Sequence, residues 1–321
     1  MDSKDKIYLN FKEKVNKKNL SLSNLFTKYQ NAYLDKNYKI EEFFFFINDN
    51  IIYIPFTSKK SSKSCYFFYS SPATVYSSKP LDFLEFKIKV KNFLRKFFSS
   101  DIEYNFLMVT TYETLSKIDI KVINPVSVEE LQVINLNLDE NKIFHNMKPN
   151  HKNMIRKILK INNVEFKIYD YKNYSEGLML DMMRMHEEVS GRKTRSPETW
   201  KINEEMIVKK LGFLVQASYK KKIISYSFFY HNLEECCYFS SVSIKDSIEL
   251  GGINHTSIWY AIKFAKKLGL KRMKLGATKY LYARNKNLID EKKKNIAFFK
   301  SRFCGETEIH ITIDKETNIE S

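Results

Sequence analysis

Hydrophobic and polar positions alternate along the first half of the chain with two different periods. Two apolar runs between Glu42 and Phe56 flank the polar turn Asn48–Asn50, a pattern typical of a β-hairpin. Apolar residues recur at spacings of three and four in Asp82–Phe98, which predicts an amphipathic helix. Further strands are predicted at Phe106–Thr110 and Leu131–Leu138. This half has the pattern of a core built from strands and helices, and it carries no chemical signature.

The second half shows a more regular succession of elements. The predicted elements are helix Pro149–Leu159, strand Val164–Tyr169, helices Gly177–Val189 and Ser196–Lys210, strands Phe213–Tyr219, Ile223–His231 and Glu235–Ser243, a helix ending at Leu268, strand Arg272–Leu275, helix Glu291–Cys304 and strand Ile309–Ile313. The glycine pair Gly251-Gly252 leads from the three successive strands into the helix that ends at Leu268. Free backbone amides in the first turn of that helix would favour an anion.

Length and composition exclude several classes of protein. The chain has 321 residues, of which 43% are hydrophobic, enough for two domains with a packed core. With 8 glycines, it has no Gly-rich dinucleotide-binding loop. Its four cysteines form no C-x-x-C pair, so no metal site is predicted. The longest apolar run, Phe43–Ile47, is too short to span a membrane, and the N-terminus lacks a secretory signal, which predicts a cytoplasmic protein.

Positive charge is concentrated in the second half. The net charge is +17; residues 1–145 carry 21 basic and 17 acidic side chains, and residues 146–321 carry 33 and 20. The excess predicts an anionic partner, such as a nucleotide, a coenzyme, tRNA or lipid headgroups. One helix places four cations at a spacing of four: Lys148, Lys152, Arg156 and Lys160. This stripe is either a solvated face or a surface that binds an anion.

Five local strings follow one another between residues 131 and 306. They are Ile134–Leu136 leading into Asn150–Lys157; His186 with Ser190–Ser196; Gly252–Trp259; Ala265–Gly269 through Leu275–Ala277; and Glu291–Phe303. In this order they resemble the FemABX-like branch of the GNAT acyltransferase superfamily, which includes peptidoglycan-bridge aminoacyl ligases and acyltransferases found with surface-polysaccharide enzymes. The resemblance implies an α/β (α+β) fold of two GNAT-like domains, each a mixed central sheet flanked by helices. A degenerate domain would occupy residues 1–145, and an acyltransferase-like domain residues 146–321.

The resemblance also implies where substrates bind. Arg192 and Arg195 lie in a basic loop between two helices, where the planar guanidinium group is suited to a phosphate. We predict that they bind a substrate anion, together with Lys152 and Arg156.

Gly251 and Gly252 stand where an acyl-CoA-dependent GNAT carries its pyrophosphate loop, so we also count them as phosphate-binding residues. Here the glycines are adjacent and no Arg or Gln lies three positions before them, which departs from the family's pattern. His255 follows in the first helical turn, and imidazole titrates near neutral pH. His186, Glu249 and His255 are all candidate general bases, and the spacing does not select among them.

The last helix supplies the strongest catalytic candidate, Lys300. Many acyl-CoA-dependent GNATs place a tyrosine general acid in this helix, whereas this chain has Phe298 and Phe299. Fem-type proteins carry a Phe-Lys pair, which Phe299-Lys300 matches. A lysine there would stabilise charge that develops on the transferred carbonyl or on the leaving group. The alternative is a surface lysine like the neighbouring Lys292–Lys294.

These observations predict an N-acyltransferase that transfers an acyl group from acyl-CoA, with no permanently bound cofactor, to an amine of an amino sugar or cell-envelope polysaccharide precursor. Aminoacyl-tRNA is the alternative donor, as in a Fem-like peptidoglycan ligase. A non-catalytic basic module that binds RNA or anionic lipid is a second alternative. Expected partners are a nucleotide sugar or a lipid-linked precursor, and the charge also allows tRNA and the inner face of an anionic membrane. We expect a cleft between the two halves, lined by Arg192, Arg195 and Lys300.

Overall fold

The computed structural model describes residues 3–18, 24–34, 39–47, 49–58, 65–66, 73–74, 76–79, 105–116, 119–244 and 250–314. The chain forms two compact units. The N-terminal unit comprises Met1–Leu131, Ala277–Ile296 and Thr307–Ser321, and the C-terminal unit comprises Gln132–Gly276 and Ala297–Glu306. These units are discontinuous, whereas the two domains predicted from the sequence are continuous, and that division stays a prediction.

The N-terminal unit contains the predicted β-hairpin. Its described elements are α1 (Ser3–Lys18), α2 (Asn24–Leu34), β1 (Lys39–Ile47), β2 (Asn50–Ser58), β3 (Cys65–Tyr66), β4 (Ala73–Thr74), β5 (Tyr76–Ser77), β6 (Asn105–Thr110), α4 (Tyr112–Ser116) and α5 (Ile120–Ile123). Strands β1 and β2 pair antiparallel from Ile47↔Asn50 onward, which confirms the predicted turn. The ring of Tyr8 in α1 stacks on Phe44 of β1 at 3.7 Å. The helix predicted at Asp82–Phe98 lies outside the described residues.

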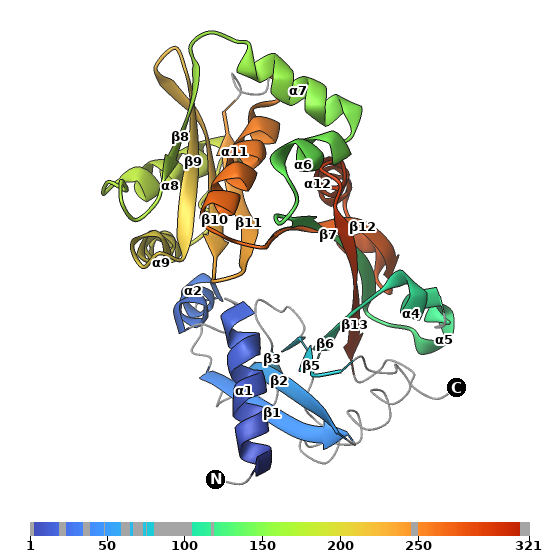
Figure 1. The fold of residues 1–321 in the computed structure, drawn as a ribbon. Helices are drawn as coiled ribbons and strands as arrows, with labels where there is room; N and C mark the ends of the chain where they lie inside the picture. The colour runs from blue at the N-terminus through green and yellow to red at the C-terminus, as the bar shows by residue number, and fades with distance from the viewer. Residues whose placement is uncertain are drawn as a thin grey trace. The chain divides into compact units, whose positions relative to one another are not determined.

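The C-terminal unit is built on a mixed sheet, shown with its helices in Figure 1. Its elements are α6 (Glu140–Asn146), α7 (Pro149–Leu159), β8 (Val164–Tyr169), α8 (Leu178–Ser190), α9 (Pro197–Val208), β9 (Gly212–Tyr219), β10 (Lys222–His231), β11 (Glu235–Ser243) and α11 (Ile253–Lys267). Four elements contribute residues to both units: β7 (Ser127–Asn135), β12 (Arg272–Ala283), α12 (Glu291–Ser301) and β13 (Glu306–Asp314). The short helix η2 (Lys286–Leu288) belongs to the N-terminal unit.

The strand order in this unit is β7-β12-β11-β10-β9-β8. The pairs from β8 to β11 are antiparallel, and β11 pairs parallel with β12. The α/β fold class, with a mixed sheet flanked by helices, is therefore confirmed. Among the helices that the structure describes, none is both long and apolar enough to cross a bilayer. In the same described part, no group of three or more His, Cys, Asp or Glu side chains could hold a metal ion.

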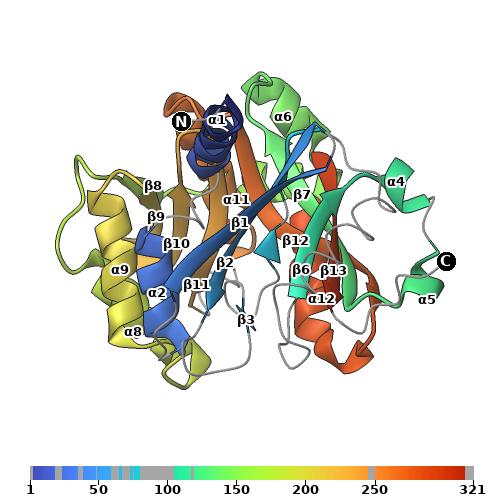
Figure 2. The same cartoon turned by 90° about the horizontal axis from the view of Figure 1, so that it is seen from below.

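Helices cover both faces of the strands β9 to β11, as Figure 2 shows. Phe213 and Phe229 stack at 5.1 Å, and Phe213 also meets Phe264 of α11. This face carries the main apolar core, which includes the buried Cys236. Helix α8 packs on α9 and on β11, and α9 packs on β9. The core fixes α11 against the strands, and with it the position of the helix's first turn.

Most predicted bounds in the C-terminal half lie within two residues of those in the structure, and four elements differ more. Strand β13 runs over Glu306–Asp314 instead of the predicted Ile309–Ile313. The strand predicted at Leu131–Leu138 is β7, which ends at Asn135 because the chain turns there toward α6, a helix that the pattern did not predict. Strand β12 continues to Ala283, well past the predicted end at Leu275. Helix α12 ends at Ser301, three residues before the predicted Cys304.

Candidate active site

Lys300 lies where strands β11 and β12 separate. The ladder between these strands covers three residue pairs, from Glu235↔Arg272 to Cys237↔Lys274. The ammonium nitrogen of Lys300 is 6.0 Å from the ring centroid of Tyr238, the next residue of β11. On β12 it approaches Gly276, two residues beyond the last pair: a β-carbon built on that glycine would lie 3.0 Å from Lys300 Nζ.

The ladder between β11 and β12 ends early. Within the described chain, no strand pairs with the β12-facing edge of β11 beyond Cys237. The register between β10 and β11 also shifts at Phe228/Phe229, so Phe239 is an extra residue on β11. A bulge of this kind re-aims the side chains beside it. Backbone N–H groups next to a cation could receive a carbonyl oxygen or an oxyanion.

The surroundings of Lys300 weaken its positive charge. The side chain is half-buried, and burial lowers the pKa of its ammonium group below the usual value, because the charged form loses solvation. In the described part of the chain, the ammonium nitrogen has no carboxylate within ion-pair distance and no hydrogen bond. A desolvated cation without a counter-ion is prepared to bind negative charge from a substrate. The surface-lysine alternative does not describe this position.

The buried His151 and the half-buried His255 form a pair beside α12. Their ring centroids are 4.2 Å apart, and His255 also meets the ring of Phe299 at 4.9 Å. Burial, and then the proximity of His151, lower the pKa of His255 to about 4. Its Nδ1 atom is buried and has no hydrogen-bond partner among the described residues. The low pKa makes His255 a weak base, which limits its strength as the predicted general base.

The basic loop predicted from the sequence contacts β11 at Phe239 and Ser240, next to the residue that Lys300 approaches. Arg195 is half-buried; its guanidinium group stands over the rings of Trp200 and Phe239 and donates from Nη2 to Ser240 Oγ at 3.2 Å. Among the residues that the structure describes, its Nη1 is buried without a hydrogen-bond partner. Arg192 is exposed. Lys300 is near Tyr238, which packs on Phe229, whereas Arg195 contacts Phe239, which packs on Phe228 and Tyr230. Because successive residues of a strand face opposite sides of the sheet, the structure places the two cations on opposite faces of β11.

His186 supports the same loop. Its Nδ1 lies 3.2 Å from Thr194 Oγ1, and its ring packs at 5.6 Å from Trp200. These contacts hold the loop that carries Arg195 against α9. They give His186 a structural role in the described arrangement, and its role as a base stays a prediction. Glu249, the third predicted base, lies outside the described residues.

The glycine pair before α11 has a packing role. Gly252 is the N-cap of α11 with φ of 88°, and a β-carbon there would lie 2.9 Å from the carbonyl oxygen of Met154 and 3.0 Å from Ile158 Cγ1. Only glycine permits both this backbone conformation and this approach of α7 to α11. At Gly251, the nearest atom to a β-carbon is 3.9 Å away. Close helix packing therefore explains Gly252 without a phosphate, and phosphate binding at the pair stays a prediction.

Two members of the predicted cation stripe already have partners within α6. Lys152 Nζ donates to the carbonyl oxygen of His145 at 3.1 Å, and Arg156 stands over the ring of Phe144 at 5.3 Å. Lys148 and Lys160 are exposed. Two of the four cations thus hold α7 against α6, a role that their spacing in the sequence did not indicate.

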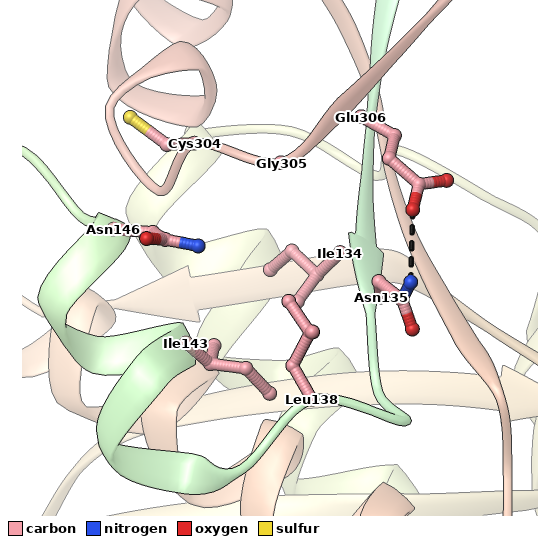
Figure 3. Close-up of a pocket in the computed structure, with 8 residues that line it drawn as sticks. All are labelled: Ile134, Asn135, Leu138, Ile143, Asn146, Cys304, Gly305 and Glu306. Atoms are coloured by element: carbon pink, nitrogen blue, oxygen red, sulfur yellow. Dashed lines mark hydrogen bonds between the residues drawn. The ribbon is translucent and has the colours of Figure 1, made fainter.

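The C-terminal unit also has a pocket of about 390 Å³ at the end of β7, shown in Figure 3. Its apolar side consists of Ile134, Leu138 and Ile143, and Asn135 Nδ2 donates to Glu306 Oε1 at 2.9 Å on another side. The remaining lining residues are Asn146, Cys304 and Gly305. None of the predicted site residues lines this pocket.

The structure adds His151 to the residues around Lys300, a residue that the sequence pattern did not single out. His151 is 4% exposed, and its Nε2 lies 2.9 Å from the carbonyl oxygen of Phe299, the residue before Lys300. Its partner is a backbone atom 148 positions away. A histidine in the first turn of a helix carries no signal of such a contact.

Comparisons with known proteins identify the fold. No protein-family model and no curated protein sequence matches the chain. The crystal structure of FemX superposes with a TM-score of 0.60 at 9% identity, covering 94% of this chain and 92% of FemX. The C-terminal domain of a putative lysylphosphatidylglycerol synthetase from Agrobacterium fabrum superposes with a TM-score of 0.50 at 11% identity, covering 86% and 84%. A conserved protein of unknown function from Bacteroides thetaiotaomicron has a TM-score of 0.50 and 11% identity over 91% and 90%.

The chain therefore has a FemABX-like, GNAT-related fold. FemX is the most extensively superposed of these three structures, with 94% of the chain included. At identities near 10% the likeness shows the fold alone. It confirms the family resemblance of the five sequence strings at the level of the fold.

Proposed function

We propose that this protein is a transferase that moves an acyl or aminoacyl group to an amine of an amino sugar or cell-envelope precursor. The observation that carries the proposal is the half-buried ammonium group of Lys300 beside Gly276, where β11 and β12 stop pairing. The FemX-like fold and the Phe299-Lys300 pair support the same reaction class.

The reaction that we propose needs no covalent enzyme intermediate. The nitrogen lone pair of the acceptor amine attacks the donor carbonyl carbon, and a C–N bond forms as the carbonyl oxygen becomes an oxyanion. When that intermediate collapses, the C–S bond of a thioester or the C–O bond of an ester breaks, and the donor leaves as an anion. The proton of the amine passes to a base or to the leaving group. Lys300 and backbone amides of β11 stabilise the oxyanion.

Arg195 is our candidate for binding an anionic group of the acceptor. Stacking between Trp200 and Phe239 holds its guanidinium plane, and Ser240 accepts from one of its nitrogens. The unpartnered Nη1 could donate to a carboxylate or a phosphate once a ligand or a side-chain movement gives access. A nucleotide sugar or a lipid-linked precursor carries such a phosphate. Arg195→Lys would retain the charge and lose the planar guanidinium, so it should raise the KM of the acceptor more than it lowers kcat.

Acyl-CoA is the donor that we propose first, and aminoacyl-tRNA is the alternative. Both deliver an activated carbonyl on a phosphate-rich carrier, which suits the positive charge of the second half. Thermal-shift measurements with acyl-CoAs, charged tRNA, uncharged tRNA and nucleotide sugars distinguish them. A ligand that binds only the native state stabilises the protein by about 2.7 kcal/mol when its free concentration is about 100 times its Kd.

The outcome of this screen decides between a transferase and a binding module. The proposal expects a shift with one donor class, together with an amide product whose mass equals that of the acceptor plus the acyl group minus one hydrogen. Equal, steeply salt-dependent shifts with every polyanion, and no amide product, would instead indicate a non-catalytic module. If Lys300→Met still shows the thermal shift but forms no amide product, both ligand binding and catalysis can be assigned to the site around Lys300.

A further inference from the structure

We propose that His151 is a positioning residue for Lys300, an inference that rests on the proposed function. Its ring N–H holds the last turn of α12, and with it the lysine side chain that projects from this turn. His151 belongs to α7 and touches α12 from the side of the core. The contacts of the two helices carry the inference.

The end of α12 needs outside hydrogen-bond donors. The last four carbonyl groups of an α-helix have no partner four residues ahead. In α12 the chain closes with short turns: Arg302 N donates to Phe299 O at 3.4 Å, Phe303 N to Lys300 O at 3.2 Å, and Cys304 N to Ser301 O at 3.3 Å. Long bonds of this kind hold a helix end weakly. The carbonyl of Phe299 receives a shorter bond, 2.9 Å, from His151 Nε2.

Helix α7 contributes a second bond to the same turn. The backbone N–H of Lys148, its N-cap residue, donates to the carbonyl oxygen of Arg302 at 3.0 Å. The two accepting carbonyls belong to Phe299 and Arg302, which lie on either side of Lys300 in the sequence. The first turn of α7 therefore clamps the turn of α12 from which Lys300 reaches Gly276.

The contact fixes the tautomer of His151. A carbonyl oxygen accepts hydrogen bonds and does not donate them, so Nε2 of His151 must carry the proton. The ring is packed between Phe303 at 4.7 Å and His255 at 4.2 Å, with Phe299 at 5.4 Å. Burial lowers the pKa of His151. A neutral ring that donates from Nε2 positions the turn without placing a further positive charge beside Lys300 and Arg302.

The position of Lys300 can be measured without an activity assay. Acetic anhydride acetylates lysine in its uncharged form, so labelling as a function of pH, read by peptide mass spectrometry, gives a titration midpoint for each lysine. Lys160, the exposed C-cap residue of the helix that carries His151, provides an internal reference. In the wild type, the Lys300 midpoint should lie below that of Lys160, because the half-buried ammonium group is desolvated.

Two variants separate the hydrogen bond from the volume of the ring. In His151→Leu, the midpoint of Lys300 should move to that of Lys160 as the turn loosens. His151→Gln places an amide N–H near the position of Nε2 and should keep most of the wild-type difference. His145→Gln, at an exposed histidine of α6, is the matched control and should change nothing. A folded His151→Leu protein with the wild-type Lys300 midpoint would overturn the proposal.

The wild-type protein supplies a test that needs no variant. Long-range ¹H–¹⁵N spectra of histidine-labelled protein should show His151 with its proton on Nε2 at pH 7, and the opposite tautomer would overturn the proposal even if His151→Leu did not fold. Once a substrate is in hand, His151→Leu should lower kcat by about tenfold to a hundredfold with KM changed less than twofold. If the labelling results hold but no donor and acceptor are turned over, the proposed function fails and the positioning role of His151 remains.

Discussion

Lys300 Nζ occupies the space beside Gly276, at 3.0 Å from where a β-carbon of that residue would lie. Gly276 also has a φ of 87°, in the left-handed region that other residues rarely adopt. The glycine thus lets β12 bend past the ammonium group at the point where it leaves β11. Lys300 of the last helix can approach β12 here because Gly276 has no side chain in its way.

Gly276→Ala should displace Lys300 and reduce turnover. The backbone strain alone should cost about 1–2 kcal/mol of stability. Gly269→Ala is the matched control, because Gly269 has a similar φ of 78° and nothing within 4 Å of its would-be β-carbon. Urea unfolding should show similar losses of stability in both variants, whereas kcat should fall in Gly276→Ala alone. Equal turnover in the two variants would show that the space beside Gly276 does not matter for the reaction.

Gly252→Ala should destabilise the protein more than Gly251→Ala. Both positions have positive φ, but a β-carbon at Gly252 would meet the backbone of α7 at Met154, whereas that at Gly251 meets nothing closer than 3.9 Å. The difference in the free energy of unfolding should reach about 1–3 kcal/mol, the usual cost of overpacking a close contact. Equal losses, accompanied by a weaker donor affinity in Gly252→Ala, would favour the phosphate-binding prediction over the packing role.

The lowered pKa of His255 should make the stability of the protein depend on pH below neutrality. Because the pKa of His255 is about 4 in the folded protein and about 6.5 when unfolded, the unfolded chain binds the extra proton first as pH falls. The contribution of neutral His255 to the free energy of unfolding is therefore fully present above pH 6.5, and it is lost progressively between pH 6.5 and 4. His255 should account for a loss of up to about 3 kcal/mol across this range.

The variants His255→Gln and His145→Gln test this pH dependence. Urea unfolding at pH 7, 6, 5 and 4 should give a smaller loss of stability in His255→Gln than in the wild type. His145 is exposed, and its replacement should leave the pH profile unchanged. An unaltered profile in His255→Gln would mean that His255 is protonated in the folded protein at the same pH as in the unfolded chain.

Local patterns predicted the elements of the C-terminal unit well, because polar turns and glycines mark their ends. Strands Val164–Tyr169 and Glu235–Ser243 have the predicted bounds. The predicted end of β12 at Leu275 is wrong, since Gly276 continues the strand with a positive φ instead of ending it. A glycine that follows an apolar run marks a turn in most sequences, and the pattern does not reveal a strand that bends around a lysine from another helix.

The candidate site was predictable in part. The resemblance of Phe299-Lys300 to a family pair selected Lys300, and the structure shows the half-burial that this role needs. The contacts with Tyr238 and Gly276 depend on tertiary structure, as does the bond from His151 to a backbone carbonyl. For Lys152 and Arg156 the spacing in the sequence suggested an anion site, whereas in the structure both side chains contact α6.

Lys300→Met provides the most direct test of the proposed function. Steady-state kinetics should be measured with the donor and acceptor that the ligand screen identifies, beside the melting temperature of each variant. If Lys300 stabilises charge that appears in the transition state, kcat should fall by about 10² to 10³-fold, with KM nearly unchanged and the melting temperature scarcely altered. Wild-type kcat and KM in a folded Lys300→Met protein would contradict the account, because the ammonium group beside Gly276 would then have no part in the reaction.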